Sequence, residues 1–281
     1  MNRVILSLVF ALLLSACGSA PAPRSATDEA AIQWDRRGQE AYRRGEYQEA
    51  LAAYEEALRR YASVEHAEGT GIELLNVAMV ESRLGNRERA LQVLDQVLAS
   101  RDAAMPARFK AEAAYRRAHM DIEAGNAVGA SSWLERAQGF CGDASCEVAG
   151  RLQNMQARLA LLRGDITGAE AAARRGLDIN HRRGDALEEA NSLRLLADGA
   201  SRRAQYPQAL TFYEQALALD KSAAEPTKIT LDLLGASRSL AAQGKTDAAV
   251  EYAERARRVA DSVNDDRGRE QAQALLKSLG R

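Results

Sequence analysis

The residues of this chain that are best suited to chemistry are three cysteines, three histidines and a few adjacent acid pairs. No two histidines are three or four residues apart, and none stands beside a second cysteine or a carboxylate pair at metal-ligand spacing. No glycine-rich phosphate loop and no nucleophile elbow is present in the sequence. The histidines and acid pairs are His66, His119, His181, Glu55 with Glu56, Glu188 with Glu189, and Asp265 with Asp266. We interpret them as solvated or hydrogen-bonded side chains, and we expect no enzymatic activity, no metal and no cofactor.

The first cysteine, Cys17, follows a predicted secretory signal. A short basic start precedes an apolar run at residues 4–14, which is too short to span a membrane. The sequence Leu14-Ser15-Ala16-Cys17 resembles the lipobox of bacterial lipoproteins. This resemblance implies that residues 1–16 are removed and that Cys17 carries a diacylglycerol and an amide-linked acyl chain, which together give stable anchoring. The alternative is an ordinary signal peptide that ends near a cysteine.

The residue after Cys17 bears on which membrane holds the anchor. Lipoproteins that stay in the inner membrane typically have Asp at this position, whereas this chain has Gly18. The resemblance therefore implies an outer-membrane anchor with the protein on the periplasmic side. Residues 17–30 are small, polar and proline-containing, which is typical of a flexible tether that could reach up to roughly 40 Å.

Cys141 and Cys146 form an even pair with four residues between them. In an oxidising compartment such a pair favours a structural disulfide, which would stabilise the fold by roughly 2 kcal/mol on the chain-entropy model. Two intervening residues would instead indicate a redox motif. A metal or redox role and two free thiols are the alternatives.

The elements that position these residues follow a regular period. Alanines recur at steps of 39 or 40 residues, at Ala50, Ala90, Ala130, Ala169, Ala209 and Ala249. A fixed period of this size indicates stacked repeats. Five residues before each alanine stands a glycine, except in the fifth unit, which has Ala204, and glycine can end a helix in the left-handed conformation. Each unit is therefore predicted to be two helices joined by a tight turn, with Asn86, Asn126 and Asp165 capping the second helix.

The first unit carries the fullest pattern, namely Trp34, Gly38, Gly45, Tyr47, Ala50, Tyr54 and Ala57. This pattern resembles the tetratricopeptide repeat family, and the resemblance covers about residues 31–262. It implies an all-α solenoid of about six helix-turn-helix repeats over residues 31–281. The expected repeats are 31–70, 71–110, 111–149, 150–189, 190–229 and 230–264, followed by a capping helix within 265–281. The usual period is 34 residues, so the first helix of each pair, or the segment before it, is expected to be longer here.

The overall charge argues against nucleic acid as a partner. Without the predicted signal, 37 Lys and Arg residues face 39 Asp and Glu residues. Nucleic-acid binding needs a basic excess or a basic face. Aromatic residues make up only 5% of the chain, so a base-stacking surface is not expected either.

Polar residues at the first-helix positions that line the concave face of tetratricopeptide proteins form a candidate partner groove. They are Arg43, Asn76, Arg83, Arg116, Asn154, Arg158, Asn191, Arg194, Arg202 and Arg238. Their types resemble the lining with which some family members hold the carboxylates and backbone of a peptide, and Arg suits bidentate carboxylate recognition. The alternative is ordinary solvent-exposed arginine. The apolar groove positions are either a binding strip or packing residues; they are Ile72, Leu75, Met79, Leu161, Leu162, Leu231 and Leu234.

The resemblance implies a protein-protein adaptor rather than an enzyme. We expect an outer-membrane lipoprotein whose groove docks proteins of an envelope complex that makes or hydrolyses cell wall or assembles the envelope. A pilotin-like factor for the type IV pilus secretin is one alternative, although its repeats are nearer 34 residues. A lipoprotein that self-associates without a separate client is the other.

Overall fold

The computed structural model describes residues 25–101, 104–142 and 146–281, and within them the chain forms thirteen α-helices and no strand. The predicted signal, Cys17 and the tether up to residue 24 lie outside the described residues. The helices are α1 (Ala26–Arg43), α2 (Tyr47–Ser63), α3 (Ala67–Arg83), α4 (Arg87–Ala99), α5 (Ala107–Glu123), α6 (Ala127–Cys141), α7 (Ala149–Leu162), α8 (Ile166–Arg183), α9 (Ala186–Arg202), α10 (Tyr206–Ser222), α11 (Pro226–Ala242), α12 (Thr246–Ser262) and α13 (Asp266–Ser278).

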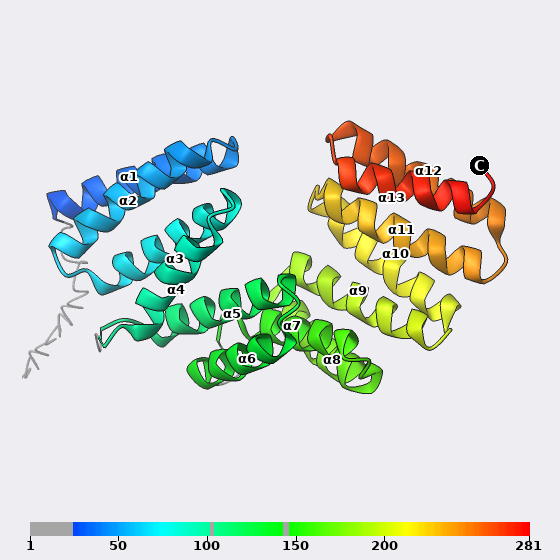
Figure 1. Ribbon diagram of the computed structural model, residues 1–281, viewed down its shortest axis with the longest axis horizontal. Coiled ribbons are helices and arrows are strands. Elements are labelled where there is room, and N and C mark those ends of the chain that lie inside the picture. The colour runs from blue at the N-terminus through cyan, green and yellow to red at the C-terminus, as the bar shows by residue number, and fades with distance from the viewer. Residues whose placement is uncertain (1–24, 102–103, 143–145) are drawn as a thin grey trace, which may run out of the picture.

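The helices pack as six consecutive antiparallel pairs that are closed by α13, and the pairs follow one another along an arc (Figure 1). Each helix packs on the next one in the chain. Beyond these neighbours, the further contacts join odd-numbered helices, such as α5 with α7, α7 with α9 and α9 with α11. The odd-numbered helices are therefore closest to one another and form the concave side. The all-α solenoid predicted from the sequence is confirmed.

The turns within the pairs have the conformation that the repeated glycines predict. Gly45 has φ of 79° and Gly244 has φ of 76°, both in the left-handed region. Ala204 adopts the same conformation in the fifth pair with φ of 58°, a rare state for a residue with a Cβ. The fifth turn thus follows the backbone geometry of the others without a glycine.

Capping of the second helices follows the prediction only in part. Asn126 and Asp165 accept hydrogen bonds from the amides of Gly129 and Gly168, at 3.0 and 2.8 Å. Asn86 makes no such bond, and its side-chain amide donates to the Glu81 carboxylate at 2.8 Å. A buried acid in the preceding helix therefore competes for the Asn86 side chain.

The first helix begins earlier than the sequence analysis places it. α1 starts at Ala26, so residues 26–30, which were expected in the tether, are helical. The cause is a capping box, in which Ser25 accepts from the Asp28 amide and the Asp28 carboxylate accepts from the Ser25 amide. The paired helices of α9 to α12 are 17 residues each, so the long period is shared between both helices of a pair.

Small residues at fixed positions let the helices approach closely. All six of the repeated alanines are buried, and Ala50, Ala90, Ala130, Ala209 and Ala249 are fully inaccessible. A Cβ on Gly38 of α1 would lie 2.6 Å from the ring of Tyr54, which is itself buried. At the far end, Ala272 of α13 packs with Leu233 and Leu234, so α13 covers the last apolar face.

Cys141, the last residue of α6, and Cys146, which precedes α7, are joined by a disulfide with a Cα–Cα distance of 5.2 Å. The Arg183 guanidinium, at the end of α8, donates to the carbonyls of Cys146 and Glu147. In the part of the chain that the structure describes, no helix is both long and apolar enough to cross a membrane.

Candidate functional site in the concave groove

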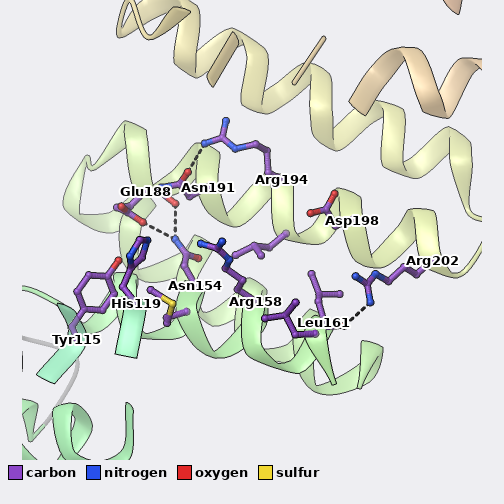
Figure 2. Close-up of a pocket in the computed structure, with 13 residues that line it drawn as sticks. Tyr115, His119, Asn154, Arg158, Leu161, Glu188, Asn191, Arg194, Asp198 and Arg202 are labelled. Atoms are coloured by element: carbon purple, nitrogen blue, oxygen red, sulfur yellow. Dashed lines mark hydrogen bonds between the residues drawn. The ribbon is translucent and has the colours of Figure 1, made fainter. Parts of the chain in front are cut away.

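The concave side contains a hollow of about 490 Å³ between α5, α7 and α9, which we call the concave groove. Its lining residues are Tyr115, His119, Asn154, Met155, Arg158, Leu161, Leu162, Glu188, Asn191, Arg194, Leu195, Asp198 and Arg202 (Figure 2). Polar and apolar side chains share its wall. This composition suits a polypeptide segment with mixed side chains.

Five of the ten predicted groove residues line this hollow, namely Asn154, Arg158, Asn191, Arg194 and Arg202. The other five lie elsewhere on the odd-numbered helices: Arg43 on α1, Asn76 and Arg83 on α3, Arg116 on α5 and Arg238 on α11. The prediction therefore selected the correct set of helices. It did not separate the residues that meet in one hollow from those spread along the solenoid.

Several of the predicted arginines bind the preceding odd-numbered helix instead of facing solvent freely. Arg116 donates to the Leu75 carbonyl at 2.6 Å, and Arg202 donates to the Leu161 carbonyl. Arg83 donates to the Tyr42 hydroxyl at 3.1 Å. Each partner stands 41 residues earlier, one repeat back. We call Arg83, Arg116 and Arg202 the staple arginines, because they join consecutive repeats across the concave face.

Arg194 is held by two fully buried carboxylates. Its guanidinium contacts Asp220 of α10 and lies 3.1 Å from the Asp232 carboxylate of α11, and it also donates to the Asn191 side chain. Asp220 and Asp232 are 0% exposed. Burial raises the pKa of Asp232 to about 8, against the opposing effect of Arg194, and the nearby Asp220 raises it further. Arg194 thus stabilises the α9–α10–α11 junction.

The asparagines are also engaged in internal bonds. The Asn154 amide donates to the Glu188 carbonyl and carboxylate, at 3.0 and 2.9 Å, and its oxygen accepts from Ser192 at 2.6 Å. Asn180 of α8 donates to the same Glu188 carbonyl at 3.1 Å. The network ties α7 and α8 to the start of α9. Asn76 likewise donates to Glu73 at 3.2 Å.

Arg43, Arg158 and Arg238 differ from the other predicted arginines. Within the described residues they make no hydrogen bond and no ion pair, and their side chains are exposed, as those of Arg83 and Arg202 also are. Arg158 lies on α7 inside the concave groove, and Arg238 lies on α11, near enough to the groove residue Asp198 for its charge to lower the pKa of that carboxyl group. These guanidinium groups remain available to a ligand.

Two titratable groups lie close to these free arginines. Burial lowers the pKa of His119, with Glu123 opposing the shift and Arg158 adding to it. Burial raises the pKa of Asp198, which the Tyr213 hydroxyl and the positive charge of Arg238 partly offset. Asp198 therefore favours its neutral form more than it would in water, which leaves the positive charge of Arg238 less compensated, and His119 favours the neutral imidazole, which adds no second positive charge beside Arg158.

The sequence analysis missed the acidic residues that hold the concave side together. Glu112 bridges Arg116 and Arg151 at 2.7 and 2.6 Å; burial alone would raise its pKa, but the two arginines lower it. Glu73 is 1% exposed, and burial beside Asp35 raises its pKa to about 8. A signal was present, because Asp35, Glu73 and Glu112 follow one another at 38 and 39 residues, close to the repeat period.

The apolar groove positions divide between packing and exposure. Leu75, Leu161 and Leu234 are buried and pack in the core. Leu162 is 59% exposed and Leu231 is 45% exposed, so both present apolar surface on the concave side. Across the described ranges, no group of three or more His, Cys, Asp or Glu side chains could hold a metal ion.

Comparisons with known proteins agree with this architecture. Tetratricopeptide repeat models match residues 38–65 and 192–227. No curated protein matches the chain. A signal transduction ATPase with a tetratricopeptide repeat sensor, from Pyrococcus horikoshii, is similar over 90% of this chain with a TM-score of 0.66 and 17% identity. This chain spans only 38% of that protein.

Two further solved structures have similar helix arrangements. A Rap protein in complex with competence and sporulation factor is similar over 90% of this chain and 71% of its own, with a TM-score of 0.61 and 16% identity. PilW, described as a widely conserved type IV pilus biogenesis factor, is similar over 86% of this chain and 98% of its own, with a TM-score of 0.61 and 14% identity. Repeat matches, helix pairing and fold similarity together show that the chain contains tetratricopeptide repeats and folds as a tetratricopeptide-like solenoid.

Proposed function

We propose that this protein is a non-enzymatic scaffold that docks other proteins in its concave groove, anchored to the outer membrane through Cys17 and facing the periplasm. The observation that carries the proposal is the groove itself. It combines the unpaired Arg158 with the exposed Leu162 on a surface that repeated helix pairs hold in place. Tetratricopeptide solenoids generally offer extended concave surfaces for binding.

The membrane anchor is supported by the N-terminal sequence. An apolar run at residues 4–14 ends at Leu14-Ser15-Ala16-Cys17, and Gly18 follows. A lipid at Cys17 would hold the solenoid close to the membrane surface and would confine its clients to the envelope. We propose clients that belong to a complex for cell-wall synthesis, cell-wall hydrolysis or envelope assembly.

A second candidate is a role in type IV pilus assembly. The specific support is that this chain covers 98% of PilW, so the two solenoids are similar in extent. The 39- or 40-residue period argues for the more general envelope scaffold, because pilotin repeats are expected nearer 34 residues.

The proposal is tested by crosslinking in living cells, followed by purification through a C-terminal tag and mass spectrometry. A Cys17→Ala variant serves as the control, because it keeps the solenoid but removes the predicted lipid. Enrichment of cell-wall enzymes with the native protein alone supports the envelope scaffold, whereas enrichment of a secretin supports the pilus role. Recovery of only the protein itself would replace both with self-association.

A further inference from the structure

The concave arginines fall into two groups according to their partners. The staple arginines and Arg194 are bound to carbonyl, hydroxyl or carboxylate groups of this chain. Arg158 and Arg238 are exposed and have no hydrogen bond or ion pair in the described ranges. They stand 80 residues apart, at equivalent positions two repeats away from each other on α7 and α11.

The two acids that line the concave groove already accept hydrogen bonds from within the chain. Asp198 accepts from the buried Tyr213 hydroxyl, and Glu188 accepts from Asn154. A cationic ligand would meet carboxylates that already accept internal hydrogen bonds and would be repelled by two guanidinium groups that lack partners, whereas an anionic ligand would be attracted by those guanidinium groups. Arg also offers a bidentate fork that matches a carboxylate. Charge complementarity on this face therefore selects an anionic ligand.

We propose that the concave groove and the adjoining surface of α11 bind an extended polypeptide segment that carries two acidic side chains about six residues apart, one at Arg158 and one at Arg238, with an apolar side chain between them. The inference rests on the proposed function, because it names the chemistry of the client segment that the groove would dock.

The spacing follows from the helix arrangement. α7, α9 and α11 are neighbours on the concave side, since α7 contacts α9 and α9 contacts α11. Packed helices lie about 8–10 Å apart, so α7 and α11 are separated by about 20 Å. An extended chain advances about 3.3 Å per residue, and about six residues therefore span this distance.

The apolar component is placed by the leucines between and beside the two arginines. Leu162 on α7 and Leu231 on α11 are both exposed, and Leu195 on α9 lines the groove between them. An apolar side chain in the middle of the segment would cover these leucines when the two acids reach their arginines.

The test uses the purified protein and fluorescein-labelled peptides of eleven residues with a central leucine. Two aspartates are placed two to eight residues apart, and matched peptides carry asparagine or lysine at the same positions. Fluorescence anisotropy should give a Kd at least tenfold lower for aspartates about six residues apart than for their asparagine counterparts. Arg158→Glu and Arg238→Glu should each raise that Kd at least tenfold.

Two controls keep fold effects separate from recognition. Arg182→Glu changes an arginine on α8 whose side chain is 62% exposed, and it should leave the Kd unchanged. The double variant Arg158→Glu with Arg238→Glu should bind the lysine peptides, because the charge pattern is then reversed on both sides. Rescue of this kind requires a folded groove.

Equal affinity for aspartate and asparagine peptides, or binding by none of them, would overturn the inference. A photocrosslinker at Leu162 in cells separates this failure from failure of the scaffold proposal. Capture of a client there, with no dependence on peptide charge, keeps the scaffold and removes the two-acid recognition. If no client is captured and no peptide binds, both the scaffold proposal and the two-acid recognition proposal are wrong.

Discussion

Two buried carboxyl groups, Asp232 on α11 and Glu73 on α3, each have a pKa of about 8 because burial disfavours their charged forms. A carboxyl group with a raised folded pKa contributes stability that is complete below its unfolded pKa, near 4. That contribution is lost as the pH rises through the folded value. The free energy of unfolding should therefore fall as the pH rises from 5 to 9.

Asp232→Asn tests this at one residue. Among the described residues, the substitution leaves Asp220 as the one carboxylate that pairs with Arg194, so it removes the excess buried charge above pH 8. We expect the free energy of unfolding of the variant to be at least about 1 kcal/mol above that of the native protein at pH 9, since one pKa unit corresponds to about 1.4 kcal/mol. At pH 5 this difference should disappear. Urea unfolding at both pH values measures the difference, and parallel pH profiles would contradict it.

The distinction between staple and free arginines is also a residue-scale prediction. Arg116→Ala removes the bond to the Leu75 carbonyl and the ion pair with buried Glu112, so it should cost about 1–3 kcal/mol of unfolding free energy. Arg158→Ala removes no internal bond and should change it by less than about 0.5 kcal/mol. The two variants differ only in position, and equal unfolding midpoints in urea would refute the assignment.

At the scale of the helix, close approach depends on the small residues inside each pair. A Cβ on Gly38 would meet the buried Tyr54 ring at 2.6 Å, whereas a Cβ on Gly139 of α6 has no neighbour within 4 Å. Gly38→Ala should therefore destabilise the protein by about 1–3 kcal/mol. Gly139→Ala should stabilise it by about 0.5–1 kcal/mol through helix propensity. Thermal unfolding of the two variants should give shifts of opposite sign, and a higher unfolding temperature for both variants would show that helix propensity alone decides.

Helices and turns were the features that sequence could predict best. The periodic alanines predict close packing of the helices, and the turn glycines predict a left-handed backbone conformation. Each of these features depends on the residue type at a single position. The start of α1 and the side chain of Asn86 were predicted wrongly, because each depends on a local competition for hydrogen bonds. The sequence shows which side chains could form these hydrogen bonds, but only the three-dimensional structure shows which of the bonds form.

The groove was predictable as a face but not as a site. Sequence position placed Arg116, Arg158 and Arg202 on the concave side alike. Their difference arises from whether a carbonyl or carboxylate of the preceding repeat lies within reach, which depends on the superhelical offset between repeats. Of the two acids that bind Arg194, Asp232 of α11 stands 38 residues later, close to the repeat period, whereas Asp220 of α10 stands 26 residues later and follows no repeat spacing.

At the scale of the whole molecule, the solenoid presents one continuous concave side while its convex side is formed by the even-numbered helices. We propose that client proteins dock on the concave side. Leu162 on α7 and Val128 on α6 provide a matched pair of probes, since they are exposed aliphatic residues at 59% and 79%. Only Leu162 lies in the concave groove.

The most direct test is a photoreactive amino acid at Leu162 or at Val128, followed by irradiation of living cells and analysis of tagged protein on gels. The account predicts a discrete crosslinked band of higher mass for the Leu162 probe. That band should weaken with Arg158→Glu and should be absent for the Val128 probe. Equal bands from both positions, or a Leu162 product that contains only this protein, would contradict docking of a client in the groove.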